Sequence, residues 1–217
     1  MSQSPVAILD YGIGNIRSIS NAVEALGETP LLTRNPEEIL GAKGLIFPGV
    51  GAFSKGMENL HEFDLIPVIH DYVATGKAFL GICLGMQMLF EWSEEFGITQ
   101  GLGLIAGKVI QMPLDAGENL KLPHISWNSI LEPEPGKWDD TILKGVTPDQ
   151  ETYFVHSYVG VPADSRNLLA VTNYGKCSFC SAVRSENIYG VQFHPEKSRD
   201  IGLNILKNFI NLTTKNH

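Results

Sequence analysis

Short apolar runs alternate with helix-like segments along the first half of the chain. The runs have the length and composition of buried strands, and they are Val6–Leu9, Leu31–Thr33, Gly44–Phe47 and Ala78–Leu80. The helix-like segments space their apolar residues by three or four positions or begin with proline and acids, and they are Ile16–Leu26, a segment that starts at Pro36, and Phe63–Thr75. This rhythm predicts an α/β fold, in which an open, mostly parallel sheet is flanked by helices on both faces.

The second half carries shorter β-like runs without long helices between them. These runs are Leu104–Ile110, Thr152–Val155, Leu168–Thr172, Phe179–Val183 and Ile188–Phe193. They predict a smaller antiparallel β extension, and Ile201–Leu212 is expected to close the fold as a helix. The Pro-rich segment Glu132–Gly136 is interpreted as a loop, and the sequence has no internal repeat. We therefore expect residues 1–217 to form a single domain.

Composition and charge exclude several classes of protein. With 43% hydrophobic and 18% charged residues, the chain has a globular composition. The net charge of −8 and the lack of a Lys/Arg cluster argue against a nucleic-acid-binding surface. No apolar run reaches the ~18 residues that a membrane span requires, and Met1–Pro5 has no signal-peptide pattern. Together with an odd number of cysteines, 3, these features predict a cytoplasmic protein.

One cysteine stands between two glycines directly after an apolar run. The segment Gly81–Gln87 reads Gly-Ile-Cys-Leu-Gly-Met-Gln and follows Ala78–Leu80. A strand that turns sharply into a helix here would place the Cys83 thiol at the tip of a strained turn, as in a nucleophile elbow. A Cβ at either glycine would meet neighbouring backbone, and a helix N-terminus favours a thiolate. The alternative is a small buried cysteine in a Gly-rich corner.

A histidine and a glutamate two residues apart follow the last β-like run. His194 and Glu196 flank Pro195, just after Ile188–Phe193. With the proline holding the backbone extended, both side chains project on one side. The carboxylate can then accept a hydrogen bond from one imidazole nitrogen while the other nitrogen faces the thiol. We therefore predict a triad of Cys83, His194 and Glu196; the alternative for His194 is a solvated loop histidine.

Three of the glycine-rich segments come directly after predicted strands. They are Gly12–Asn15, Pro48–Phe53 and the turn at Cys83. In an open parallel sheet, binding sites form beyond the carboxyl ends of the strands. We therefore expect these segments to share one edge of the molecule.

Two motifs together resemble the class I (triad) glutamine amidotransferases. They are Gly-x-Cys-x-Gly-x-Gln at Gly81–Gln87 and the late His-Pro-Glu at 194–196. Further blocks resemble the glutaminase subunit of imidazole glycerol phosphate synthase, an enzyme of histidine biosynthesis, or a close paralogue of that subunit. In chain order these blocks are Ile8–Asn15 with Ser18, Pro48–Phe53, Pro123–Asn128, Tyr153–Tyr158 and Gln192–Ser198. The resemblance spans nearly the whole chain and implies the flavodoxin-like, three-layer fold of that family.

The resemblance implies hydrolysis of L-glutamine to glutamate and ammonia. Cys83 would attack the side-chain amide, and His194 would accept the thiol proton and return it to the departing ammonia. Glu196 would orient His194 and stabilise its cation. Water would then hydrolyse the thioester, so no metal and no organic cofactor is expected.

The resemblance also assigns roles around the triad. The oxyanion formed in amide hydrolysis needs backbone donors, which would be the amide of Leu84 and one from Val50 or Gly51, in a loop that a peptide flip could switch. The alternative for this loop is a simple Pro-Gly turn. The residues expected to bind glutamine are Gly49, Gln87, Glu95 for the α-amino group, and Ser157 and Tyr158, whose backbone would hold the α-carboxylate. Gln87 and Glu95 could instead be solvent-facing residues.

A partner subunit follows from the fate of the ammonia, which becomes non-nucleophilic ammonium in neutral water. Because the recognised blocks span nearly all of the 217 residues, no acceptor-binding domain is expected among them. In the resembling family the partner is a (β/α)₈-barrel cyclase, in a heterodimer that makes imidazole glycerol phosphate and a purine precursor, aminoimidazole carboxamide ribotide. The positions that resemble its docking and gating residues are Asn15, Trp127, Asn128 and Lys197.

Cys177 and Cys180 form a C-x-x-C that is not expected of the histidine-pathway subunits. Two cysteines are too few for a structural zinc site, and ordinary packing on opposite faces of a strand is favoured.

Three alternative functions are weighed against the glutaminase of the histidine pathway. The segment around Cys177 and Cys180 is reminiscent of paralogues that feed ammonia to sugar-amidating enzymes of surface-polysaccharide synthesis. A non-catalytic regulatory subunit is disfavoured by the intact triad. A cysteine protease or esterase is disfavoured by Gln87 and the glycine-rich loop.

Overall fold

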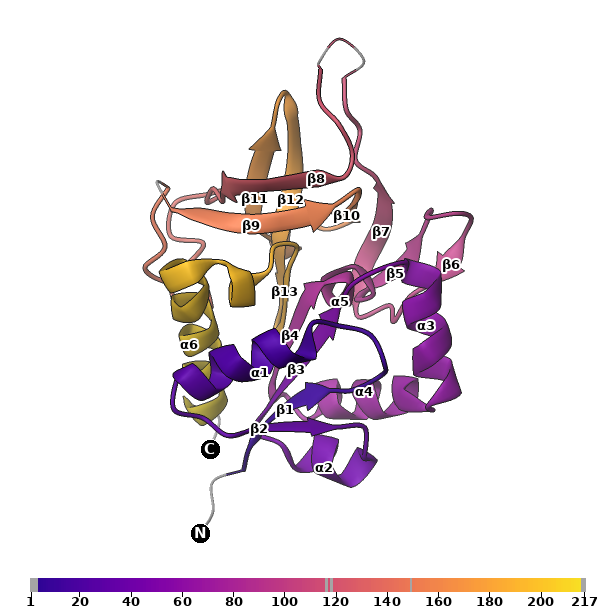
Figure 1. The fold of residues 1–217 in the computed structure, drawn as a ribbon, viewed down its shortest axis with the longest axis vertical. Coiled ribbons are helices and arrows are strands. Elements are labelled where there is room, and N and C mark those ends of the chain that lie inside the picture. The colour runs from indigo at the N-terminus through magenta and orange to yellow at the C-terminus, as the bar shows by residue number, and fades with distance from the viewer. Residues whose placement is uncertain (1–3, 116, 118, 149, 216–217) are drawn as a thin grey trace.

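The computed structural model describes residues 4–115, 117, 119–148 and 150–215, and its centre is a seven-stranded sheet (Figure 1). The expectation about Met1–Pro5 therefore falls partly on residues 1–3, which lie outside the described residues. The strands of the sheet, in spatial order, are β11 (Leu168–Tyr174), β12 (Cys177–Ser185), β13 (Ile188–Val191), β4 (Ala78–Cys83), β3 (Gly44–Gly49), β1 (Val6–Leu9) and β2 (Pro30–Thr33). The five strands from β13 to β2 are parallel, and β11 and β12 extend them antiparallel.

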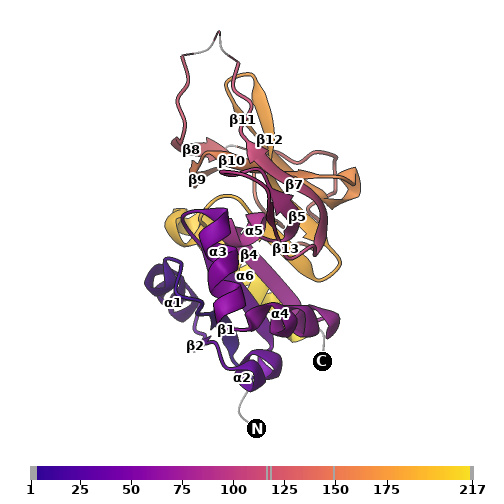
Figure 2. The same ribbon diagram turned by 90° about the vertical axis from the view of Figure 1, so that its right-hand side faces the viewer.

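Two smaller sheets stand above the carboxyl ends of the parallel strands (Figure 2). One contains β10 (Tyr158–Pro162), β7 (Ile105–Gln111), β5 (Phe90–Ser93) and β6 (Thr99–Gln100). The other is an antiparallel pair, β8 (His124–Ser129) and β9 (Glu151–His156). These sheets place loops from the second half of the chain over the edge where the glycine-rich segments emerge.

Helices cover both faces of the central sheet, as the alternating pattern predicts. Apolar residues of α1 (Ile16–Ala25) and α6 (Arg199–Lys215) pack into the core on one face. The opposite core receives residues of α2 (Pro36–Gly41), α3 (Phe53–Glu62) and α4 (Leu65–Ala74). Two 3₁₀ turns, η1 (Ser165–Asn167) and η2 (Pro195–Lys197), and the one-turn helix α5 (Leu84–Gln87) complete the described elements. The fold is thus the expected three-layer α/β arrangement.

The order of the parallel strands has a functional consequence. Spatial order β2-β1-β3-β4-β13 is that of flavodoxin-like sheets, with β13 as the fifth strand. Strand β13 comes last along the chain and lies beside β4, so Val191 pairs with Ile82. The segments that follow β4 and β13 therefore emerge side by side.

The structure departs from the predicted layout in one strand and adds one helix. The run Ile188–Phe193 belongs to the parallel part of the main sheet, not to the antiparallel extension, and its strand ends at Val191. Helix α3, for which no element was predicted, forms because Phe53, Met57 and Leu60 recur on one face and are buried.

The two cysteines of the C-x-x-C pack on opposite faces of β12. Cys177 belongs to the core under α1 and α6, and Cys180 to the core under α3 and α4. Both are buried. An odd spacing in a strand sends side chains to opposite faces, so the favoured packing interpretation is confirmed. None of the helices in the described part of the chain combines the length and apolarity that crossing a bilayer requires.

Candidate active site

Cys83 sits at the tip of a sharp turn between β4 and α5. Its backbone is in a strained conformation, with φ 55° and ψ −109°. Close packing enforces the turn: a Cβ on Gly81 would lie 2.9 Å from the backbone of Gly85, and a Cβ on Gly85 would overlap the Phe47 carbonyl oxygen. The sequence can turn this tightly only because both flanking residues are glycine.

The helix that follows the cysteine is shorter than expected. Helix α5 ends at Gln87, and β5 begins three residues later at Phe90. A single turn carries only a small part of a helix macrodipole. The short helix therefore gives little support to the expected preference for a thiolate at Cys83.

His194 and Glu196 meet where the last parallel strand ends, but the backbone between them is not extended as expected, because Pro195 begins the 3₁₀ turn η2. The Nδ1 atom of His194 lies 2.8 Å from Oε1 of Glu196, and both side chains are buried. The carboxylate can only accept, so Nδ1 carries the proton of this contact. The Nε2 atom is buried and makes no hydrogen bond within the described residues. It is therefore the nitrogen available for the predicted proton exchange with the thiol.

The charge state of His194 is set by its two neighbours. Burial lowers its pKa, but the interactions of the imidazole with nearby Cys83 and with Glu196 outweigh burial and raise the pKa to about 10. The imidazole is therefore held as a cation at neutral pH.

A set of hydrogen bonds clamps the histidine segment to β9. The amide of His194 donates to the Tyr153 carbonyl at 2.9 Å. The Ser198 hydroxyl donates to the His194 carbonyl at 2.6 Å and accepts from the Tyr153 amide at 3.0 Å. Because Ser198 is fully buried, this clamp fixes the backbone that carries His194.

Most of the predicted site residues line one cavity of about 310 Å³. Its lining residues are Val50, Gly51, Cys83, Leu84, Gln87, Glu95, Phe96, Pro123, Val155, His156, Ser157, Tyr158 and His194. Glu196 lies behind His194. Gly49 is buried and does not line the cavity; it pairs with Cys83 in the sheet and packs against Tyr11 and Leu84. Its contact with glutamine stays a prediction.

The loop after β3 is open, in contrast to the elbow. Gly51 has φ 96°, and no atom lies within 4 Å of the position that a Cβ would occupy. Val50 is 39% exposed. The start of the loop is anchored by Tyr11, whose hydroxyl donates to the Pro48 carbonyl at 2.7 Å. Backbone donors on this loop thus have room to reorient beside Cys83.

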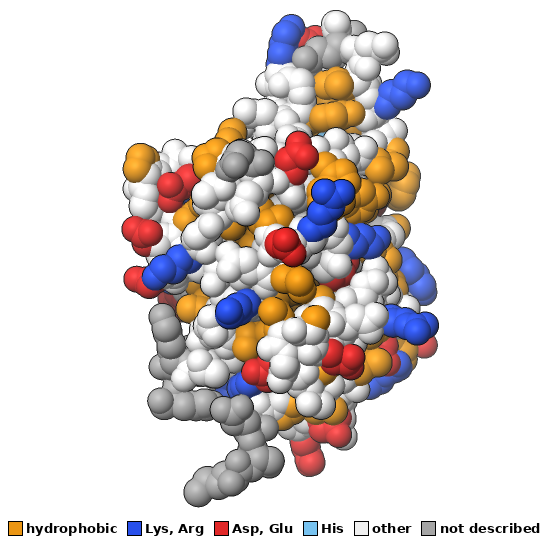
Figure 3. Space-filling view, turned by 60° about the vertical axis from the view of Figure 1, so that its left-hand side comes forward, with side chains coloured by type: hydrophobic (Ala, Val, Ile, Leu, Met, Phe, Trp, Pro, Cys, Tyr) orange, Lys and Arg blue, Asp and Glu red, His pale blue; other side chains and the backbone are white. Residues whose placement is uncertain are grey.

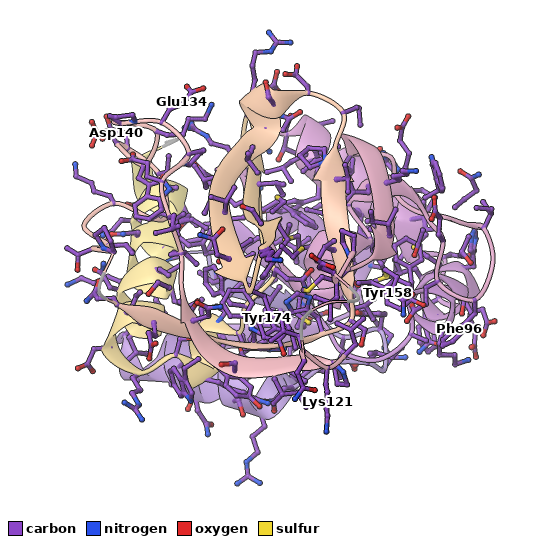
Figure 4. All side chains as sticks on the ribbon, turned by 90° about the horizontal axis from the view of Figure 1, so that it is seen from above. Phe96, Lys121, Glu134, Asp140, Tyr158 and Tyr174 are labelled. Carbon is purple, nitrogen blue, oxygen red and sulfur yellow. The ribbon has the colours of Figure 1, made fainter. Side chains whose placement is uncertain are left out.

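Two side chains of the cavity wall are held by backbone groups. Gln87 donates through Nε2 to the Tyr158 carbonyl at 3.0 Å, so it is buried rather than solvent-facing. The Oε2 atom of Glu95 accepts from the Phe53 amide at 2.5 Å, at the start of α3. Beside it, Phe96 is 87% exposed and lies on the same side of the molecule as Tyr158 when seen from above (Figure 4).

A buried histidine pair supports the far wall of the cavity, and the sequence motifs gave no indication of it. Nδ1 of His156 lies 3.0 Å from the Tyr158 carbonyl, and Nε2 lies 3.3 Å from Nδ1 of His124. Because the carbonyl can only accept, the network assigns the proton of His156 to Nδ1 and makes His124 the donor to Nε2. Burial lowers the pKa of His124 to about 4 and that of His156 to about 3, so both rings are neutral.

Sequence reasoning also did not single out Gln192. It is fully buried, and its Nε2 lies 3.7 Å from Sγ of Cys83. A polar residue at the end of an apolar strand is a weak signal for such a contact. The contact itself depends on the pairing of β13 with β4, which joins residues 109 positions apart.

The predicted interface residues lie in elements that contact one another near the histidine segment. The Trp127 ring is half-buried, packs edge-on against Tyr153 at 5.7 Å and is covered by the Arg199 guanidinium at 4.6 Å. The Lys197 ammonium lies 5.6 Å from the Tyr153 ring. Asn128 donates to the Asn173 carbonyl, and Asn15 precedes α1 without capping it through its side chain. Figure 3 shows acidic, basic and apolar side chains interspersed on the side where α1 and α6 lie.

Comparison with known proteins bears on both fold and family. The family model for glutamine amidotransferase class-I matches residues 7–212. The chain is 43% identical over 212 residues to the imidazole glycerol phosphate synthase subunit HisH 1 of Legionella pneumophila (strain Lens), covering 96% of this chain and 100% of that relative. It is 47% identical to subunit HisH of Methanosarcina barkeri, covering 95% and 98%.

Solved structures agree on the fold at low sequence identity. The structure of PurLQS from Thermotoga maritima superposes with a TM-score of 0.70 at 18% identity, covering 97% of this chain and 99% of the other. A structure described as a glutamine amidotransferase gives 0.69 at 20% identity, covering 96% and 98%. The chain therefore belongs to the class I glutamine amidotransferases, in the branch of the imidazole glycerol phosphate synthase subunits HisH.

Proposed function

We propose that this chain is the glutaminase subunit of an imidazole glycerol phosphate synthase and hydrolyses L-glutamine through a thioester on Cys83. One observation carries the proposal: Cys83 and His194 line the same cavity, and Glu196 holds the far nitrogen of His194 at 2.8 Å. A nucleophile, a proton carrier and a group that orients the carrier are thereby brought together from both ends of the chain.

The reaction begins with the sulfur of Cys83 as a thiolate and His194 as a cation. The sulfur forms a bond to the side-chain carbonyl carbon of glutamine, and the carbonyl electron pair moves onto oxygen. When this oxyanion collapses, the C–N bond breaks and His194 gives its proton to the leaving nitrogen, which departs as ammonia. Water, deprotonated by neutral His194, then attacks the thioester and releases glutamate, which restores the initial pair.

Backbone amides would stabilise the oxyanion. Leu84 and Gly51 both line the cavity beside Cys83, and Val50 lies between Gly51 and β3. We assign one donor to Leu84, on the rigid elbow, and the second to Val50 or Gly51, on the open loop. Each donor of this kind is worth ~10²–10³ in turnover, so the position of the loop sets the rate.

The α-groups of glutamine would bind at the opposite wall of the cavity. Oε2 of Glu95 accepts from the Phe53 amide, and Oε1 would accept from the α-ammonium. Backbone groups of Ser157 and Tyr158 would hold the α-carboxylate, supported by the histidine pair behind them. Gln87 completes this wall beside the nucleophile.

The relatives are named as subunits, and we propose a (β/α)₈-barrel cyclase as the partner in a heterodimer. The partner would cover the cavity and receive ammonia before it is protonated by bulk water. We place its docking surface at Asn15, Trp127, Asn128 and Lys197, near the segment that carries His194. We further propose that residues 1–217 act as one domain, in the cytoplasm, where glutamine is available.

The test uses the chain purified together with its barrel partner. Glutamate release from glutamine is expected in the complex, and the Cys83→Ala variant is expected to lose it while still binding the partner. Cys177→Ala is the matched control, because it removes a buried thiol remote from the triad, and it is expected to stay active. Retained turnover in Cys83→Ala would contradict the proposal. Co-purification of an ATP-dependent sugar amidotransferase instead of a barrel would reassign the ammonia acceptor.

A further inference from the structure

The Tyr158 carbonyl fixes the orientation of a buried carboxamide. A carbonyl oxygen can only accept, so the atom of Gln87 that lies 3.0 Å from it must be the nitrogen. The same nitrogen lies 3.0 Å from a terminal atom of Gln192. A carboxamide nitrogen carries two N–H groups, and each of these two contacts uses one of them.

The orientation of Gln192 follows from that of Gln87. The terminal atom of Gln192 that faces the Gln87 nitrogen must be an acceptor, so it is Oε1. The other branch, Nε2, is then directed at the sulfur of Cys83, at 3.7 Å. The Gln192 side chain is fully buried, and its backbone amide donates to the Ser181 carbonyl at 2.9 Å. The direction of the N–H toward sulfur is thus determined by the network rather than by a free rotation.

We propose that Gln192 is a further catalytic residue, whose side-chain N–H donates to the Cys83 sulfur and stabilises its thiolate, and that Gln87 orients it. The inference rests on the proposed role of Cys83 as the nucleophile. The Val155 carbonyl, at 4.0 Å from the sulfur, can accept from a thiol but cannot stabilise an anion. A donor gains strength when its acceptor becomes charged, so Gln192 favours the thiolate over the thiol.

The hydrogen bonds of Gln87 and Gln192 also connect Cys83 to the cavity wall that is proposed to bind the α-groups of glutamine. Tyr158 belongs to the segment assigned to the glutamine α-carboxylate, and its carbonyl is the point at which the Gln87 side chain is anchored. The chain of contacts runs from this carbonyl through Gln87 and Gln192 to the sulfur. Gln87 therefore acts on the nucleophile as a positioning residue, in addition to lining the cavity.

The test measures the pH dependence of Cys83 alkylation by iodoacetamide, followed by peptide mass spectrometry. In Gln192→Glu the side chain keeps its shape and can still accept from Gln87, but as a carboxylate it has no donor for the sulfur and repels a thiolate. The midpoint of alkylation is expected to move up by ~1–3 pH units. Gln100→Glu, which adds the same charge on exposed β6, is expected to leave the midpoint unchanged. Superimposable profiles for Gln192→Glu and wild type would overturn the proposal.

Turnover and folding are read separately from alkylation. For Gln192→Glu, kcat is expected to fall ~10- to 100-fold, the loss that corresponds to a hydrogen bond to a charged group, with a smaller change in KM. Alkylation needs no glutamine, so a wild-type enzyme that fails to hydrolyse glutamine would refute the proposed function without deciding this inference.

If Gln192→Glu does not fold, the wild-type chain supplies the readout. The side-chain ¹H–¹⁵N resonances of Gln192 are expected to shift as Cys83 titrates and to stay constant with pH in Cys83→Ala. Gln192 side-chain resonances that do not change as the Cys83 thiol titrates would overturn the proposal.

Discussion

The elbow at Cys83 and the loop at Val50–Ala52 lie side by side and are built on opposite principles. In the elbow, Gly81 and Gly85 have no room for a side chain, and Cys83 is 6% exposed. In the loop, Gly51 has open space around it and a backbone that favours glycine by its positive φ alone. The same residue type therefore serves close packing in one segment and conformational freedom in the other.

The difference suits the two segments to distinct tasks in the proposed oxyanion site. A nucleophile is useful only if it is held in place before the substrate arrives, and the packed elbow provides that. A donor on an open loop can be withdrawn or supplied by rotation of one peptide. We infer that the elbow holds the nucleophile in position for the reaction and that the loop controls whether the second oxyanion donor is in place.

Removal of the proposed nucleophile should have the largest effect. Cys83→Ala leaves the packing of the elbow intact but deletes the only sulfur that lines the cavity in the described residues. Turnover is expected to fall by ~10⁴–10⁶, as for other nucleophile deletions, while the melting temperature changes little. Steady-state glutaminase assays and thermal melts check this, and a large loss of stability would show that Cys83 is needed for folding instead.

Alanine at the two kinds of glycine should separate stability from turnover. Gly85→Ala is expected to lose more than ~3 kcal/mol of unfolding free energy, because its Cβ overlaps the Phe47 carbonyl. Gly51→Ala should lose only ~1–3 kcal/mol through strain at positive φ, yet reduce kcat ~10²–10³-fold by moving a donor. Urea titrations and assays on both variants provide the comparison. Equal losses of stability would contradict the contrast between elbow and loop.

The alkaline limit of activity should depend on Glu196. In the folded state the pKa of His194 is raised to about 10, against its usual 6.5. The stabilisation from its charged form is therefore fully present below pH 6.5 and lost as the pH rises through about 10. Glu196→Gln removes one cause of the shift, so the pKa should fall by ~1–3 units and the alkaline limb of kcat should move with it. Histidine NMR titrations test this; an unchanged pKa would contradict the pairing.

The clamp on the histidine segment should give the smallest effect. Ser198→Ala removes both hydrogen bonds of the hydroxyl and leaves the Tyr153 amide without its acceptor. A loss of ~1–3 kcal/mol is expected, with kcat reduced ~10-fold as His194 loosens. Ser198→Thr keeps the hydroxyl and serves as the control. Full activity in Ser198→Ala would show that β9 holds His194 without this residue.

Much of this fold could be predicted because its signals are local. Continuous apolar runs such as Val6–Leu9 and Gly44–Phe47 coincide with strands of the parallel sheet. The Gly-x-Cys-x-Gly spacing predicts a turn whose steric requirement is the one observed. The offset between His194 and Glu196 likewise predicts a contact that depends on three consecutive residues.

The features that escaped prediction depend on long-range pairing or on competing local signals. Helix α3 follows a Gly-rich loop, which masked the spacing of its apolar residues. The parallel pairing of β13 with β4 could not be predicted, because the run Ile188–Phe193 resembles any other short strand. The contact between Gln192 and Cys83 depends on this pairing, so it could not be predicted either. The pairing of His124 with His156 likewise requires the register of β8 on β9.

The most direct test is to capture the covalent intermediate. The complex is mixed with glutamine, quenched in acid within the first turnover, digested and analysed by mass spectrometry. A γ-glutamyl group is expected on the peptide that contains Cys83, and it should be absent from the peptides that contain Cys177 and Cys180. Glutamate release with no adduct on Cys83, or with the adduct on another cysteine, would contradict the account.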